Sequence, residues 1–221
     1  MKIVSIIICL IASISNSWSQ CQRSEEILFG NYPYVDVEMA ENIHWYSFNF
    51  SSTSLIGSQY FTNPYDIVQN IMPWWIKHLT KDSGDGKGKH ILKNKATIDE
   101  IEYAKSQVGE ISEPMSIVYE APGPKLLSVD SIRSIIKNYP NSSLDGIGTA
   151  LIVEQFHGYS KCGTVTFVVF NIKSKELIFA KRYRSAGGGV GIKSYWYDPL
   201  GHTASWVKAQ IEKKSINEIS K

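Results

Sequence analysis

The sequence predicts one α/β domain of the α+β type, in which helices cover a mixed or antiparallel sheet. The strongest observation is residues 149–181, where three apolar or alternating segments are separated by short polar turns, as in an antiparallel meander. A second is that helix-start residues, Asn63-Pro64 and Ser128, precede apolar positions at helical spacing. A third is that 221 residues with 43% apolar composition suffice for one ordinary core.

The three segments of the meander predict different environments. Residues 150–156 are nearly all apolar, which is typical of a central strand covered on both faces. Residues 165–172 form the second strand. Residues 177–183 alternate, with Lys181 on one face and Arg182 on the other, so we expect an edge strand with one side facing water.

The elements that precede the meander are predicted by period and by capping residues. Aromatic residues alternate with polar ones over residues 46–50, which predicts a strand with one aromatic face. Asn63 as N-cap and Pro64 at the first helical position begin a helix, which Pro73 should kink or split. A polar stretch rich in glycine and lysine covers residues 81–95, where we expect a mobile loop.

Two further helices and a short strand lie between that loop and the meander. Thr97 and Glu100 form a capping box for a helix that should end before Gly109. Residues 115–119 predict a short strand, and Ser128 caps the next helix.

A glycine-rich loop and a last helix complete the domain. Residues 187–191 read GGGVG and interrupt the strand pattern, so we expect a tight crossing from the sheet edge to the helix. Asp198 as cap and Pro199 at the first helical position should start that helix. We expect residues 20–221 to form this single domain.

The N-terminus predicts export. An apolar run over residues 3–14 follows a single lysine, and Ser17 and Ser19 supply small residues for a cleavage site. Residues 1–19 are therefore predicted to be a signal peptide, which places the mature chain in the periplasm, at the outer membrane or outside the cell. No second stretch has the length and apolar character of a transmembrane helix.

Two cysteines remain after the predicted cleavage, Cys21 and Cys162. Export permits a disulfide between them. Lipidation of Cys21 is an alternative, because its position suits a bacterial lipoprotein. The interpretation we favour leaves two unpaired thiols, with Cys162 partly buried.

Composition and motifs exclude several classes of function. The net charge of +2 provides no broad basic surface, so we expect no nucleic-acid partner. No nucleotide or cofactor motif is present, and the histidines lack the spacing of metal ligands. We therefore expect no cofactor and no metal, and we favour a protein without enzymatic activity.

The glycine-rich loop is the first candidate site, because glycine, cations and the aromatic residues 195–197 meet there. We expect this surface to bind a protein partner in the cell envelope through Arg184, Gly187, Gly188, Gly189, Gly191, Lys193 and Trp196. The alternative is a small-ligand site or enzyme active site, either at this loop or near Glu154, His157 and Cys162. A thiol and a histidine around one strand turn would suit a Cys–His dyad.

Several segments between residues 115 and 213 resemble a family of uncharacterised exported proteins of Gram-negative envelopes. The resemblance rests on SVDSIRSIIKNY, GTALIVEQF, TFVVFNIKSKELIFAKR and GGGVGIKSYWYD. It implies an envelope protein and supplies no catalytic residue. The order of elements is also similar to the small α/β domains of curli-secretion and penicillin-binding-protein activator lipoproteins, which is an analogy of fold alone.

Overall fold

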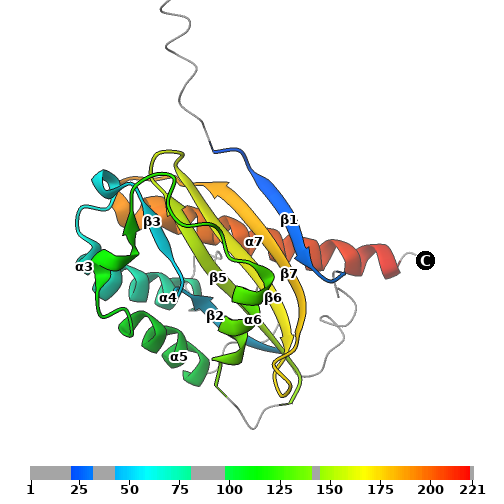
Figure 1. Ribbon diagram of the computed structural model, residues 1–221. Helices are drawn as coiled ribbons and strands as arrows, with labels where there is room; N and C mark the ends of the chain where they lie inside the picture. Colours follow the sequence, from blue (N-terminus) through cyan, green and yellow to red (C-terminus); the bar gives the residue numbers. More distant parts are fainter. Residues whose placement is uncertain (1–20, 32–42, 81–97, 141–144, 220–221) are drawn as a thin grey trace, which may run out of the picture.

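A seven-stranded mixed sheet forms the centre of the protein (Figure 1). The computed structural model describes residues 21–31, 43–80, 98–140 and 145–219. The predicted signal peptide, the loop at 81–95 and the Thr97 cap lie outside these ranges. The architecture confirms the predicted α/β class, with a sheet that is mixed rather than purely antiparallel.

The strands run in the order β1-β7-β6-β5-β3-β4, and β2 pairs with β5 beside β3. Their bounds are β1 Ser24–Phe29, β2 Ile43–Asn49, β3 Ser54–Ile56, β4 Val118–Tyr119, β5 Ile147–His157, β6 Cys162–Asn171 and β7 Leu177–Ala186. The predicted meander is confirmed, because β5, β6 and β7 pair antiparallel in succession. β5 is central, since β2 and β3 pair with it in parallel on its other side.

The prediction that residues 177–183 form an edge strand is wrong. β1 pairs antiparallel with β7 and covers its outer side. The polar residues that pointed to a wet edge have partners on β1: Lys181 Nζ lies 2.6 Å from Glu25 Oε2, and Arg182 Nη1 lies 3.1 Å from Glu26 Oε2. The acidic pair of β1 thus neutralises the basic residues of β7.

The strand predicted at residues 46–50 exists, but a bulge replaces its single aromatic face. Ser47 has φ of +64°, and the register with β5 shifts between Trp45 and Phe48. Because a bulge reverses the alternation of side chains, Tyr46 packs in one core cluster and Phe48 in the other.

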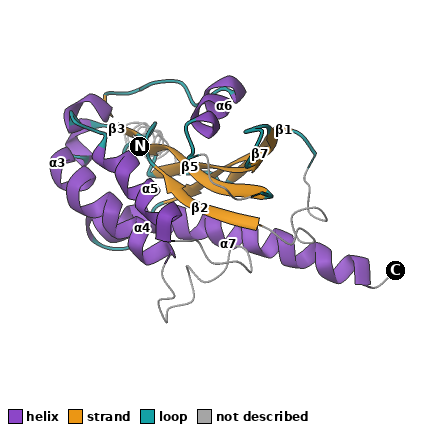
Figure 2. Ribbon diagram, turned by 90° about the horizontal axis from the view of Figure 1, so that it is seen from below, coloured by secondary structure: helices purple, strands orange, loops and turns teal. Residues whose placement is uncertain are grey.

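Helices cover the two faces of the sheet unequally (Figure 2). On one face lie α4, α5 and α7, and on the other lies α6. The helical segments are η1 Ser58–Tyr60, α3 Pro64–Asp66, η2 Ile67–Ile71, α4 Met72–Thr80, α5 Ile98–Gly109, η3 Pro114–Ile117, α6 Val129–Lys137 and α7 Gly191–Ile219. Within the described ranges, no helix is both long enough and apolar enough to cross a membrane.

Local capping predictions hold at two helix starts. The side chain of Asn63 accepts a hydrogen bond from the Asp66 N–H, and Ser128 caps α6 in the same way. Pro73 lies inside one helical run, and the turn before it widens into a π-helix instead of breaking. The strand predicted at 115–119 is mostly the 3-10 turn η3, and only Val118–Tyr119 pair with β3.

The prediction that α7 starts at Asp198 and Pro199 is wrong, because α7 begins at Gly191 and Pro199 lies inside it. A proline has no N–H to donate to the carbonyl four residues earlier. That carbonyl, on Tyr195, instead accepts a hydrogen bond from the Gly188 N–H at 3.1 Å. The glycine-rich loop therefore satisfies the group that Pro199 leaves open.

Candidate functional site

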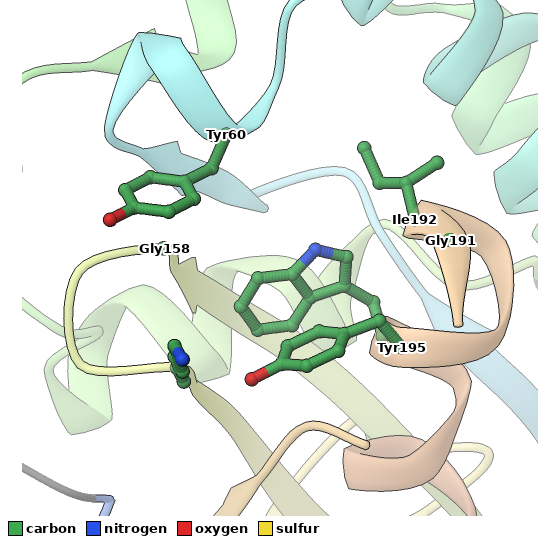
Figure 3. Close-up of a pocket in the computed structure, with 7 residues that line it drawn as sticks. Tyr60, Gly158, Gly191, Ile192 and Tyr195 are labelled. Carbon is green, nitrogen blue, oxygen red and sulfur yellow. The ribbon is translucent and has the colours of Figure 1, made fainter. Parts of the chain in front are cut away.

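A pocket of about 230 Å³ opens at the N-terminal end of α7 (Figure 3). Three segments far apart in the sequence build it: the turn η1, the β5–β6 turn and the first residues of α7. The parallel pairing of β3 with β5 brings the first two together. The lining residues are Tyr60, Gly158, Lys161, Gly191, Ile192, Tyr195 and Trp196.

The indole of Trp196 belongs to both the pocket and the core. Its exposed fraction is 3%. The ring stacks on Phe61 with centroids 5.4 Å apart and lies 5.1 Å from Phe156. Tyr195 meets it edge-on at 5.0 Å, and burial raises the pKa of the Tyr195 phenol. Because the core holds these rings, this part of the pocket is formed before any ligand arrives.

Tyr60 forms the opposite wall and is 40% exposed (Figure 3). Its ring lies over Gly158, where a Cβ would come within 2.4 Å of it. The Tyr159 ring meets it edge-on at 5.4 Å. Glycine in the β5–β6 turn therefore gives Tyr60 its place, because any larger residue would displace the ring.

Hydrogen bonds hold Tyr159 beside Tyr60. The Tyr159 hydroxyl donates to Glu120 Oε2 at 2.8 Å, and the Ser58 hydroxyl donates to Glu120 Oε1. The hydrogen bonds from Ser58 and Tyr159 lower the pKa of the Glu120 carboxyl. The hydrogen bond to Glu120 in turn raises the pKa of Tyr159. At neutral pH the carboxylate accepts and the phenol donates.

The predicted glycines fit the loop against α7. The Gly187 N–H donates to the Lys161 carbonyl at 2.9 Å. A Cβ at Gly187 would lie 2.3 Å from the Tyr195 ring, and one at Gly188 would lie 2.4 Å from the carboxylate of Asp198. Gly189 and Gly191 have φ of +89° and +76°, which favour glycine. Of the predicted glycines, only Gly191 lines the pocket.

The predicted side chains lie in three different environments. Trp196 is buried and lines the pocket. Lys193 is exposed, with Nζ 4.0 Å from the centre of the Trp74 ring, and lines an adjacent pocket of about 300 Å³. Arg184 is half-buried on β7, where its Nη2 donates to Ser160 Oγ at 3.3 Å. The structure therefore groups Gly191 and Trp196 in the pocket lining, with Lys193 in the adjacent pocket. Arg184 lines neither pocket and instead contacts the β5–β6 turn.

Several residues of this surface were missed by the sequence analysis. Val190 lies in the predicted glycine-rich loop and is 92% exposed, but it was not named among the binding residues of that loop. Tyr60 comes from a turn almost 100 positions before Gly158, so no local pattern joins them. The remaining missed lining residues are Lys161 and Ile192. The one local signal was the Gly158-Tyr159 dipeptide between two predicted strands, which indicates a turn in which another residue can approach the backbone closely.

The alternative site at Glu154, His157 and Cys162 is not a thiol centre in the structure. Cys162 forms a disulfide with Cys21, with Cα atoms 5.3 Å apart, so the interpretation of two unpaired thiols is wrong. His157 Nδ1 accepts from the Ser160 N–H at 3.1 Å. Burial, together with the charge of Arg184, lowers the pKa of His157. A Cys–His dyad requires a thiolate, which the disulfide removes.

Glu154 has a structural partner rather than a place beside His157. Its side chain is 1% exposed and binds Arg182 through both oxygens, at 2.8 and 3.0 Å. The Leu127 N–H donates to Oε2 at 2.8 Å, and the Thr166 hydroxyl donates to Oε1. These bonds attach the segment before α6 to the sheet.

The described residues do not indicate a metal site, because they contain no group of three His, Cys, Asp or Glu side chains placed to hold an ion. The pocket therefore supplies aromatic surface, backbone and one lysine for recognition. No known family model matches the chain, and no curated protein matches it.

Proposed function

We propose that this protein is an exported binding domain without enzymatic activity, which presents the pocket end of α7 to a protein partner in the cell envelope. The observation that carries the proposal is an open, preformed aromatic pocket next to exposed apolar side chains. Val190 is 92% exposed, and Tyr60 and Tyr159 are 40% and 41% exposed. Exposed apolar and aromatic residues gathered at one place are typical of interaction sites.

Export is supported by two observations of different kinds. The N-terminal segment has the pattern of a signal peptide. The Cys21–Cys162 disulfide is of a type that persists in oxidising compartments. The resemblance to exported envelope proteins agrees with both, and it adds the envelope as the proposed location.

The composition of the pocket favours binding over catalysis. Acid–base chemistry requires paired titratable groups near the reacting atoms, whereas the lining offers Lys161 and the phenols of Tyr60 and Tyr195. The volume of about 230 Å³ lies below the roughly 300–1,000 Å³ of small-molecule sites. A side chain of a protein partner fits this volume better than a cofactor.

Photo-cross-linking in the producing cells tests this proposal. A benzophenone amino acid replaces Val190 at the pocket end or, as a control, Lys173. Lys173 is exposed in the β6–β7 turn, at the other end of the sheet. We expect one reproducible protein adduct from position 190 and none from position 173. Equal adducts from both positions, or none from position 190, would contradict the assignment of this surface.

A further inference from the structure

Two exposed tyrosines and one exposed carboxylate lie together at the edge of the pocket beside α7. Tyr60 lines the pocket, Tyr159 contacts the Tyr60 ring, and Glu120 accepts a hydrogen bond from Tyr159. We infer that these three side chains bind an arginine side chain of the protein partner. The inference rests on the proposed function and adds the chemical class of the recognised residue.

The two rings form a corner that suits a cation. Tyr60 and Tyr159 are 40% and 41% exposed, and their rings meet at 82° with centroids 5.4 Å apart. A cation in such a corner can lie within about 6 Å of both centroids, a distance at which the electron-rich ring faces attract it. Arginine suits this corner better than lysine, because its planar guanidinium stacks on an aromatic ring.

Two glycines let both rings pack directly on the backbone. Gly57 has φ of +98°, and a Cβ there would lie 2.8 Å from the Tyr159 ring and 3.0 Å from the Tyr60 ring. A Cβ at Gly158 would lie 2.4 Å from the Tyr60 ring. The backbone therefore supports the corner before a ligand arrives, which reduces the entropy lost on binding.

Glu120 places a negative charge at the hydroxyl end of the Tyr159 ring. Its Oε2 accepts from the Tyr159 hydroxyl at 2.8 Å. Its Oε1 accepts from the Ser58 hydroxyl and, at 3.4 Å, from the Ser58 N–H. A carboxylate has about four lone-pair sites, so Oε2 can accept a further donor. A guanidinium that stacks on Tyr159 can therefore also donate a charge-assisted hydrogen bond to Glu120.

The charges around this corner favour a cation. Glu120 forms no ion pair with any lysine, arginine or histidine of the described residues. The hydrogen bond from Ser58, together with that from Tyr159, lowers the pKa of Glu120, so the carboxylate is ionised at neutral pH. Burial lowers the pKa of His157, whose ring lies 6.0 Å from that of Tyr159, so this imidazole is neutral there. Lys161, in the same turn, is exposed, so salt weakens its repulsion of a bound cation.

N-acetyl-argininamide and N-acetyl-citrullinamide are matched probes, because citrulline keeps the shape of arginine and has a neutral urea in place of the guanidinium. Binding to the disulfide-bonded protein is measured, at equal ionic strength, by the amide NMR shifts of Gly57 and Gly158. We expect saturable shifts with a Kd of about 10 mM for the arginine probe, as for a single side chain. The citrulline probe should bind at least about tenfold more weakly, because it lacks the charge.

Two variants test the residues that we assign to the site. Glu120→Gln removes the charge, and Tyr60→Leu removes one ring. Each should weaken binding of the arginine probe about fivefold, the size of an exposed ion pair or cation–π contact. Glu176→Gln is the control, because Glu176 is exposed in the β6–β7 turn at the other end of the sheet, and it should leave the affinity unchanged. The amide spectrum of each variant verifies its fold.

Three results would overturn the inference. They are the absence of saturable shifts with the arginine probe, equal affinity for the two probes, and unchanged affinity in the folded Glu120→Gln variant. The cross-link from position 190 tests the proposed function separately, so the two failures are distinguishable. An adduct at position 190 without discrimination between the probes would reject the arginine and retain the protein partner. Discrimination without an adduct would instead reject the protein partner.

Discussion

Replacing Glu154 by glutamine tests how the sheet holds the segment before α6. The substitution keeps the shape of the side chain and removes the charge that faces Arg182. An amide cannot satisfy the donors that now meet both oxygens, because its nitrogen is itself a donor. The amide nitrogen would replace one of the two carboxylate oxygens. Its N–H groups would then face donors of Arg182, Leu127 or Thr166.

The magnitude follows from burial. Glu154 and Arg182 are 1% and 11% exposed at the side chain, and removing one partner of a buried pair costs about 3–5 kcal/mol. Arg182 keeps its contact with Glu26, whose side chain is 63% exposed, so we expect about 3 kcal/mol. For a domain of this size, the melting temperature should fall by roughly 6–12 °C.

Urea unfolding, followed by circular dichroism, measures the free energy of unfolding of each variant. Glu26→Gln is the matched control, because it removes the exposed partner of the same arginine. An exposed ion pair contributes about 0–1 kcal/mol, so this control should change little. A loss of less than about 1 kcal/mol in Glu154→Gln, equal to that in Glu26→Gln, would refute the reasoning.

The remaining predictions concern the disulfide, a histidine and a close glycine contact. Replacing Cys21 and Cys162 by alanine should lower the free energy of unfolding by about 2–5 kcal/mol, because the bond joins residues 141 positions apart; reductant should destabilise the wild type and leave the variant unchanged. The pKa of His157 is lowered in the folded state. As the pH decreases below about 6.5, the unfolded chain therefore binds more protons than the folded protein, and the free energy of unfolding should decrease. His157→Asn should flatten this decline in urea midpoints between pH 7.5 and 5. Gly163→Ala should cost about 1–3 kcal/mol, because a Cβ there would lie 2.5 Å from Pro199 in α7. Gly109→Ala is the control, because a Cβ at Gly109 would meet nothing within 4 Å apart from its chain neighbours and its own helix backbone.

Local patterns were sufficient to predict much of the fold. The strands of the meander carry their own alternation and turns, and the caps at Asn63 and Ser128 act within one helical turn. These local patterns failed where a contact outside the pattern itself decides the outcome. Asp198-Pro199 resembles a helix start, but the N–H of Gly188 satisfies the carbonyl that Pro199 leaves open. α7 can therefore begin at Gly191, about two turns earlier than the local pattern indicates.

The site was harder to predict than the fold, because its walls come from separate segments. Gly191, Trp196 and Lys193 lie in one stretch that the sequence analysis had selected, and two of them line the pocket. Tyr60 joins them only through the pairing of β3 with β5. Trp196 shows a further limit. A tryptophan that follows a glycine-rich loop resembles an exposed anchor, but Trp196 is 3% exposed.

The central claim, that the pocket end of α7 is the binding surface, is tested most directly with the partner captured from position 190. Calorimetry would measure its affinity for the wild type, for Ile192→Glu at the pocket and for Ile27→Glu on β1. Ile27 is 59% exposed and provides the same substitution away from the pocket. We expect Ile192→Glu to weaken binding at least about tenfold, as at an interface hot spot, and Ile27→Glu to leave it unchanged. Equal affinity of the wild type and the folded Ile192→Glu variant would contradict the account.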